Sequence, residues 1–260
     1  MPLKWQVFMA EKILVGTSGW HYDHWKGPFY PERAQSGELL EFYARRFSTV
    51  EINNSFYHLP NQETFVAWRD STPPAFIFAV KASRYITHMK KLKDPEKALE
   101  KFLSCAGELG HKLGPILFQL PPRWKRNAER MRDFLAALPG NHRYAFELRD
   151  SDWFHEEIFS LLEKHNCALC LFDFAGQKSL HRLTADFAYI RLHGPSHQKY
   201  AGRYLKAQLR QWLGHAEKFL QEGAKQVFIY FDNDQQGYAA LNALETQQMA
   251  SETPFQADER

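Results

Sequence analysis

The chain has 260 residues, of which 44% are hydrophobic and 24% are charged, as in an ordinary globular protein. Its 33 basic and 30 acidic residues leave a formal net charge of only +3, too weak a field to hold duplex nucleic acid by charge alone. No apolar run reaches the roughly 20 residues of a membrane span, and the start resembles no signal peptide. With only three cysteines, we expect a cytoplasmic protein without membrane association.

Eight short apolar runs, rich in Val, Ile, Phe and Tyr, predict buried β-strands. In chain order they fall at 13–17, 49–53, 76–81, 116–120, 144–148, 168–172, 187–193 and 227–232.

Amphipathic helical patterns fill most of the connections between these strands. The strongest begins after Asp94-Pro95, and its apolar stripe runs from Ala98 to Leu113. Further stripes lie within 131–138, 158–165 and 205–220, and weaker ones within 37–46, 64–70 and 238–246. The connection 173–186 is short and polar, so no full helix is expected there.

Strands that alternate with helices imply parallel pairing through crossover connections. Eight such units in about 250 residues predict a single (β/α)8 TIM-like barrel of the α/β class, without a full helix between strands six and seven. We expect residues 1–12 to form an N-terminal extension, 13–248 the barrel domain and 249–260 a frayed C-terminal tail.

Polar side chains gather where the predicted strands end. Because side chains alternate along a strand, Glu51 shares a face with Asn53, and Glu147 shares one with Arg149. The outer face of a barrel strand must be apolar to pack on helices, so we expect the polar face to point into the C-terminal mouth, where active sites of this architecture lie. The residues expected there are Glu51, Asn53, Lys81, Gln119, Glu147, Arg149, Asp173, Arg191, His193, Asp232 and Asn233.

This ring of charges has two interpretations, because buried charges are costly unless they are paired. It is either a salt-bridge network that closes the barrel or a ligand site, and we favour an enzyme that acts on a small anionic, phosphate-bearing substrate. Glu51 or Glu147 is then the general base and His193 the acid or its partner. Guanidinium groups match phosphate oxygens, so the residues expected to bind substrate are the cations Lys81, Arg149 and Arg191, together with Trp20, Asn53, Tyr57, Gln119, Asp173, Asp232 and Asn233.

Three loops at the same end combine aromatic with basic residues or glycine. Trp20, Tyr22 and Trp25 could stack on a planar ring or a sugar, or pack as a lid. Residues 84–93 and 197–204 interleave Lys and Arg with Tyr, a pattern that suits phosphate and base contacts. The alternative function is therefore a non-catalytic nucleotide or nucleic-acid binding protein. After the last strand, Asp234 is either an N-cap or part of a phosphate site at a helix N-terminus.

A metal centre is the competing chemistry. Oxygen and nitrogen ligands end four successive strands, at Glu147, Asp173, His193 and Asp232. The neighbouring Arg149 and Arg191 favour salt bridges instead, so neither a metal nor another cofactor is predicted. Cys167 and Cys170 stand three apart on a predicted strand, so they should point to opposite faces and share no metal. Nothing in the sequence indicates the oligomeric state.

Seven segments, in this order, resemble the YecE-like family, the domain of unknown function seventy-two. They are Gly16-Thr-Ser-Gly-Trp20; Val50-Glu-Ile-Asn-Asn-Ser-Phe-Tyr57; Lys81-Ala82 with Thr87-His88; Gly114-Pro-Ile-Leu-Phe-Gln-Leu-Pro-Pro122; Phe146-Glu-Leu-Arg149; Tyr189-Ile-Arg-Leu-His-Gly194; and Tyr230-Phe-Asp-Asn-Asp234. The resemblance spans residues 13–244 and implies a TIM-type barrel, without implying a reaction. A suggested likeness of this family to apurinic-site endonucleases would imply a dense metal cluster, which this chain lacks. Asp232 stands where the family often has asparagine.

Overall fold

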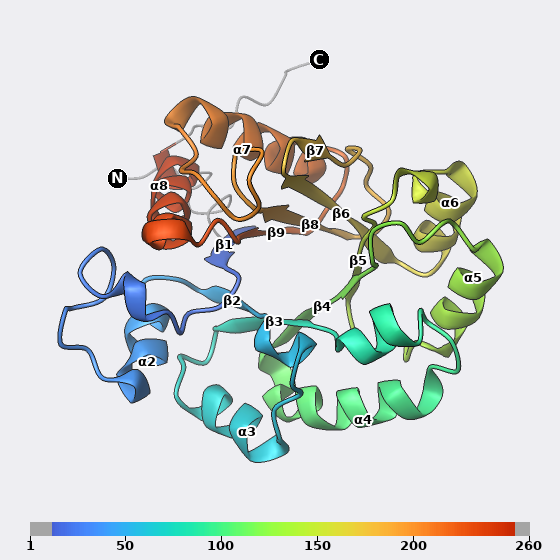
Figure 1. The fold of residues 1–260 in the computed structure, drawn as a ribbon, viewed down its shortest axis with the longest axis horizontal. Helices are drawn as coiled ribbons and strands as arrows, with labels where there is room; N and C mark the ends of the chain where they lie inside the picture. The colour runs from blue at the N-terminus through green and yellow to red at the C-terminus, as the bar shows by residue number, and fades with distance from the viewer. Residues whose placement is uncertain (1–11, 253–260) are drawn as a thin grey trace.

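Eight parallel strands form a nearly closed barrel that helices surround (Figure 1). The computed structural model describes residues 12–252, apart from the side chain of Lys178. The expected extension up to residue 11 and the tail from residue 253 lie outside the described residues. The parallel strands are β1 (Ile13–Thr17), β2 (Thr49–Ile52), β3 (Ile77–Lys81), β4 (Leu113–Gln119), β5 (Tyr144–Glu147), β6 (Cys167–Phe174), β8 (Phe187–Leu192) and β9 (Gln226–Phe231), paired in the order β1-β9-β8-β6-β5-β4-β3-β2.

A helix follows each parallel strand except β6. The helices are α2 (Leu39–Ala44), α3 (Gln62–Asp70), α4 (Glu96–Ala106), α5 (Ala128–Ala137), α6 (Glu156–Lys164), α7 (Lys206–Gln221) and α8 (Tyr238–Glu252). Between β6 and β8 the chain instead makes the short strand β7 (Gln177–Lys178), antiparallel to β6. The predicted barrel with one missing helix is confirmed. No helix within residues 12–252 is both long and apolar enough to cross a bilayer.

Two helix ends differ from the predictions. The apolar stripe that was expected to continue to Leu113 ends earlier, because α4 stops at Ala106 and a 3-10 segment covers Gly107–Lys112. Gly110 lies there with a φ of 57°, and Leu113 already begins β4. At the other end of the chain, α8 continues past the expected domain boundary at residue 248 to Glu252, because Met249 and Ala250 are buried.

The strands bury two separate apolar faces, as the alternation predicts. Outward side chains such as Ile52 and Phe118 join the core that packs under the helices. Inward side chains, including Leu117 and Tyr189, form a second cluster that fills the barrel. Cys167 belongs to the outer cluster, whereas Cys170, three residues further along β6, belongs to the inner one. The prediction that these two cysteines face opposite sides is confirmed.

A side chain helps to close the barrel between β1 and β2. The hydroxyl of Tyr43 accepts a hydrogen bond from the amide of Thr17 at 2.9 Å and lies 3.1 Å from the carbonyl oxygen of Thr49. Gly16 is needed at this seam, because a Cβ there would lie 2.3 Å from the same Thr49 oxygen. Just above, the amide of Gly19 donates to the carbonyl of Glu51 at 2.8 Å. The seam brings the ends of β1 and β2 together at the barrel mouth.

Candidate functional site

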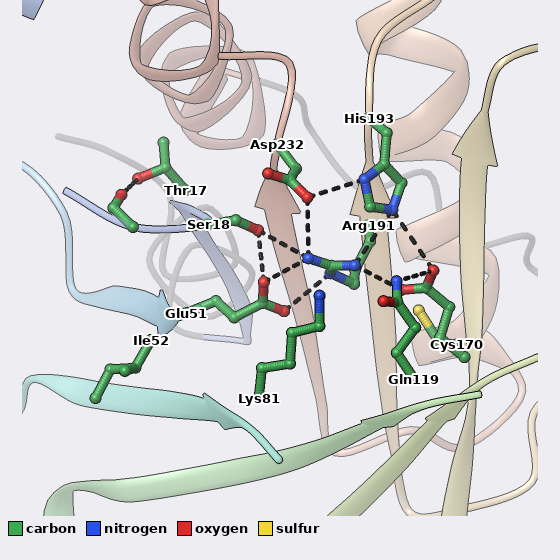
Figure 2. Close-up of polar contacts among 12 residues, drawn as sticks. Thr17, Ser18, Glu51, Ile52, Lys81, Gln119, Cys170, Arg191, His193 and Asp232 are labelled. Carbon is green, nitrogen blue, oxygen red and sulfur yellow. Dashed lines mark hydrogen bonds and ion pairs between the residues drawn. The ribbon is translucent and has the colours of Figure 1, made fainter. Parts of the chain in front are cut away.

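Arg191, on β8, is the centre of a buried polar network at the carboxyl ends of the strands (Figure 2). Its side chain is 0% exposed. Nε and Nη2 donate to the two carboxylate oxygens of Glu51 at 3.0 and 2.7 Å. Nη1 donates to Oε2 of Glu147 at 2.7 Å, and Nη2 also donates to Oδ2 of Asp232 at 3.0 Å. One guanidinium thus connects β2, β5 and the residue that follows β9.

Glu51 is held by further donors besides Arg191. The Oγ of Ser18 donates to its Oε1 at 2.6 Å, and the hydroxyl of Tyr189 donates to its Oε2, also at 2.6 Å. Its side chain is fully buried. Because both oxygens accept two hydrogen bonds each, Glu51 is a structural partner of Arg191 in this state.

Glu147 lies between two arginines. Its Oε1 accepts a hydrogen bond from Nε2 of Gln119 at 2.8 Å and another from Nε of Arg149. Burial alone would raise the pKa of this carboxyl group, but the charges of Arg149 and Arg191 outweigh burial and hold the pKa well below its ordinary value. Glu147 is therefore an ionised carboxylate at every physiological pH.

The contacts of His193 fix its tautomer. Its Nε2 lies 2.9 Å from Nη2 of Arg149 and 3.3 Å from Nη1 of Arg191. A guanidinium only donates hydrogen bonds, so Nε2 is the acceptor and the ring hydrogen lies on Nδ1, 2.9 Å from Oδ2 of Asp232. Burial opposes the charge of Asp232, but the contacts with His193 and Arg191 prevail and lower its pKa. The imidazole thus stands between a carboxylate and two guanidiniums.

Lys81 differs from the other charged groups of the centre because its amine is unpaired. It extends from β3 toward Arg191 (Figure 2) and is only 6% exposed. Within the part of the chain that the structure describes, its Nζ makes no hydrogen bond or ion pair, and lies 4.3 Å from the ring centroid of Phe56. Burial, assisted by the charge of Arg191, lowers the pKa of Lys81 to about 8. A substantial share of this amine is therefore neutral near physiological pH.

A small cavity opens beside Arg149. Its volume is about 260 Å³, and its walls include two cations and no carboxylate: Gln119, Leu120, Pro122, Arg149, Phe174, Gln177, Lys199 and Tyr200. The guanidinium carbon of Arg149 lies 3.9 Å from the ring centroid of Phe174. Nη1 of Arg149 makes no hydrogen bond with the described residues, since its Nε and Nη2 carry the contacts to Glu147 and His193. The walls of this cavity thus offer an unused guanidinium donor and a lysine.

A larger cavity, of about 450 Å³, lies elsewhere, between the loop after β1 and helices α2 and α3. Trp20 and Asn53 line it, and Trp20 packs edge-on against Trp68 with ring centroids 5.1 Å apart. No Asp, Glu, Lys or Arg is among its wall residues. Trp20 and Asn53, which were expected to bind the same ligand as Arg149, therefore line a different and largely uncharged cavity.

Three other residues that were expected to bind substrate lie apart from the Arg191 network. Asp173 shares the outward face of β6 with Leu171, by alternation, and its Oδ2 accepts a hydrogen bond from the hydroxyl of Tyr204 at 3.2 Å. Asn233 is fully buried and its Nδ2 donates to Oδ1 of Asn242 at 3.0 Å. Tyr57 is 65% exposed on the surface. Asp173 does not point into the barrel because Cys170 and Phe172 are the inward residues of β6, and alternation then turns Asp173 outward.

The aromatic loop after β1 packs as a lid. Trp25 is 0% exposed, and its Nε1 donates to Oδ1 of Asp234 at 2.5 Å. The hydroxyl of Tyr22 donates to the carbonyl of Ser18 at 2.7 Å. Asp234 stands at the N-cap position of the helical turn that follows it, but its side chain makes no cap hydrogen bond there. Burial raises the pKa of Asp234 to about 6.

Four further residues belong to the site but were not predicted from the sequence: Ser18, Phe56, Phe174 and Tyr189. Two of them carried a usable signal. Ser18 directly follows β1, as Asp232 directly follows β9, and Tyr189 shares the inward face of β8 with Arg191. The two phenylalanines had no such signal in the sequence, because each contacts a cation with its ring face and this contact follows no periodic pattern.

A metal-binding arrangement is not found at the mouth. Among residues 12–252, no three His, Cys, Asp or Glu side chains lie together in a way that could hold a metal ion. Arg191 stands between the carboxylates that a cation would need, and Asp173 faces the loop that carries Tyr204.

Comparisons with known proteins agree with this architecture. The family model described as "Protein of unknown function DUF72" matches residues 14–259. The UPF0759 protein YunF of Bacillus subtilis is 28% identical over 263 residues, which cover 88% of this chain and 92% of that protein. The UPF0759 protein YecE of Escherichia coli is 34% identical over 144 residues, or 55% of this chain and 50% of that protein.

Solved structures show the same barrel. A DUF72 family protein from Thermotoga maritima superposes with a TM-score of 0.82 at 28% identity, covering 92% of this chain and 98% of that one. D-Psicose 3-epimerase from Clostridium cellulolyticum H10, solved with D-tagatose, has a TM-score of 0.51 at 10% identity over 92% of this chain and 96% of that one, a likeness of fold alone. The chain therefore belongs to the DUF72 family and has a TIM-type barrel fold.

Proposed function

We propose that this protein is an enzyme that acts on a small anionic, phosphate-bearing substrate at the C-terminal mouth of its barrel. The observation that carries the proposal is the cavity of about 260 Å³ whose walls hold Arg149 and Lys199 but no carboxylate. Nη1 of Arg149 has no partner among the described residues, so it is available to a phosphate oxygen. The volume suits a small ligand, since it lies just below the usual range of about 300–1,000 Å³.

Arg191 takes a different part from the one expected from the sequence. All three of its nitrogen atoms already donate to carboxylates, and its side chain is 0% exposed. We therefore assign it to positioning Glu51, Glu147 and Asp232. The anion is bound by Arg149, with Lys81 and Lys199 as the neighbouring cations.

His193 is the general base of this proposal. Its Nε2 accepts hydrogen bonds from two arginines in the free protein, while its Nδ1 hydrogen faces Asp232. When a phosphate group draws the guanidinium of Arg149 toward the cavity, Nε2 loses its closest donor and can take a proton from the substrate. Asp232 then stabilises the imidazolium that forms. Glu51 and Glu147 keep Arg191 in place.

Calorimetric titration with glycerol 3-phosphate, with uncharged glycerol as the matched ligand, tests the proposal. We expect the wild type to bind only the phosphate ester and Arg149→Met to bind it at least about tenfold more weakly, since a charge-assisted hydrogen bond contributes about 1.5–3 kcal/mol. Arg182→Met is the control, because Arg182 pairs with Glu156 and Glu163 on the surface. Unchanged affinity in Arg149→Met, or no binding by the wild type, contradicts the proposal.

The second candidate is a non-catalytic nucleotide or nucleic-acid binding protein. Two exposed tyrosines next to basic residues favour it: Tyr85 follows Arg84, and Tyr200 follows Lys199. Tyr85 is 47% exposed and Tyr200 is 44% exposed. Binding of single-stranded oligonucleotides should then weaken in Arg84→Glu and Lys199→Glu, with a flatter dependence on salt. A wild type without salt-sensitive affinity for oligonucleotides eliminates this candidate.

A further inference from the structure

We infer that Lys81 is an amine nucleophile that condenses with the carbonyl group of a small phosphate-bearing aldehyde or ketone. The inference rests on the proposed function and names the substrate class of the same site. Arg149 would hold the phosphate, and Lys81 would form a covalent imine with the carbonyl carbon.

A second buried lysine shows what is unusual about Lys81. Lys112 is 4% exposed, and its Nζ donates to the carbonyl oxygen of Thr72 at 2.7 Å, to the Oγ1 of Thr72 at 3.1 Å and to the carbonyl oxygen of Arg69 at 2.5 Å. Lys81 is 6% exposed and donates to no described residue. Burial lowers the pKa of both amines. Only Lys112, however, has three acceptors that stabilise its ammonium form.

The charges around Lys81 come from five elements of the barrel mouth. Burial lowers the pKa of Lys81 most, and the guanidinium of Arg191 lowers it further. Three carboxylates raise it in part, which leaves the pKa at about 8. Burial and the charges of Lys81 and Arg84 lower the pKa of His88 to about 4, so His88 is neutral. The facing groups are Glu51, His88, Glu147, Arg191 and Asp232.

Lys81 and the cavity belong to neighbouring strands. Lys81 pairs in register with Leu117 of β4, two residues before the cavity residue Gln119, and Gln119 pairs in register with Glu147 of β5. Arg149 follows on from β5 with Nη1 free. Figure 2 shows Lys81 and Gln119 on the same side of Arg191. A substrate with a phosphate on Arg149 would extend along the ends of β5 and β4 to reach the amine.

The chemistry needs no oxidant or metal. The lone pair of the neutral amine attacks the carbonyl carbon, the π pair of the C=O bond moves to oxygen, and a proton passes from nitrogen to oxygen to give a carbinolamine. The carbinolamine takes up one proton from solvent, the C–O bond breaks, and water leaves with formation of the protonated imine. The imine withdraws electrons from the adjacent carbon, from which His193 can remove a proton.

Reductive trapping in the wild-type protein tests this inference. The protein is incubated at pH 7 with dihydroxyacetone phosphate and sodium cyanoborohydride, which reduces any imine to a stable secondary amine, and each lysine is quantified by peptide mass spectrometry. We expect Lys81 to react at least about tenfold faster than Lys112, whose amine is held by three acceptors. It should exceed the exposed Lys225 by a similar factor, because a pKa of about 8 leaves far more neutral amine than an ordinary lysine has. The rate at Lys81 should rise with pH with a midpoint near 8.

The uncharged ketone dihydroxyacetone separates the two proposals. Faster trapping at Lys81 with the phosphate ester than with the uncharged ketone supports both. If Lys81 is trapped equally fast with the two ketones, its amine is reactive, but phosphate binding at Arg149 is contradicted. Labelling of Lys225 without labelling of Lys81 overturns the inference, and it leaves the proposed function standing if glycerol 3-phosphate still binds.

Discussion

The two halves of the barrel mouth differ in whether all the donors of their cationic side chains are paired. On the side of β1, β2, β8 and β9, every nitrogen of Arg191 is paired and its side chain is 0% exposed. On the side of β3 to β6, the amine of Lys81 and the Nη1 of Arg149 have no hydrogen-bond or ion-pair partner in the described chain. A network that served only to close the barrel would leave neither the amine of Lys81 nor the Nη1 of Arg149 without a hydrogen-bond acceptor. The difference separates a fully paired half from a half with unpaired donors, and our proposal places the ligand at the second.

The comparison of two arginines gives the largest expected effect. Arg191→Met leaves Glu51, Glu147 and Asp232 without their shared cation, and breaking a buried ion pair costs about 3–5 kcal/mol. Arg149→Met should cost less, about 1–2 kcal/mol, because Glu147 keeps Arg191 and Gln119. Urea denaturation of both variants measures the two losses in the free energy of unfolding. Equal losses would mean that the halves do not differ.

The unpaired amine of Lys81 predicts a dependence of stability on alkaline pH. Its pKa is about 8 in the folded protein and near 10.5 in the unfolded chain, so the unfolded state binds more protons between these values. The free energy of unfolding of the wild type should therefore rise by up to about 3 kcal/mol from pH 8 to pH 10.5, relative to Lys81→Met. Denaturation at a series of pH values tests this. Parallel curves for the two proteins would contradict it.

Removing each buried lysine in turn sharpens the same comparison at pH 7. Lys112→Met loses three hydrogen bonds and leaves acceptors of Thr72 and Arg69 unpaired, which should cost about 1.5–3 kcal/mol. Lys81→Met removes a buried charge that has no hydrogen-bond or ion-pair partner and contacts only the ring of Phe56, so it should leave stability equal or higher. Thermal unfolding distinguishes the two variants. A larger loss in Lys81→Met than in Lys112→Met would show that Lys81 has a stabilising partner after all.

Asp232→Asn should have the smallest effect on stability. An asparagine oxygen can still accept from Nη2 of Arg191 and from Nδ1 of His193, so we expect a change of about 1 kcal/mol or less. The lost charge had raised the pKa of Lys81, so the midpoint of Lys81 trapping should move to a lower pH. A midpoint that stays in place or rises would contradict the electrostatic account of this centre.

The sequence predicted the fold and most of the network because both depend on period-two alternation. Glu51, Lys81, Glu147, Arg191 and His193 were expected to converge, and their side chains do meet at one end of the barrel. The missing helix between strands six and seven followed from a connection too short and polar to form one. The alternation of the strands and the length and polarity of one connection therefore account for the correct predictions.

The sequence could not show which cation is paired. Arg149 and Arg191 have the same side chain and both lie near the carboxyl ends of barrel strands, but only the three-dimensional arrangement gives Arg191 three carboxylates and Arg149 an open cavity. Trp25 was a candidate stacking surface in the sequence, but its indole is buried and donates a hydrogen bond to Asp234. Such pairings depend on loops and rotamers, which carry no periodic signal.

A crystal structure grown with glycerol 3-phosphate tests the division of the mouth most directly. We expect density for the phosphate within hydrogen-bonding distance of Nη1 of Arg149, with Arg191 still held by its three carboxylates. A phosphate bound to Arg191 with Glu51 or Asp232 displaced, or a mouth without phosphate at a saturating concentration of the ligand, would contradict the account.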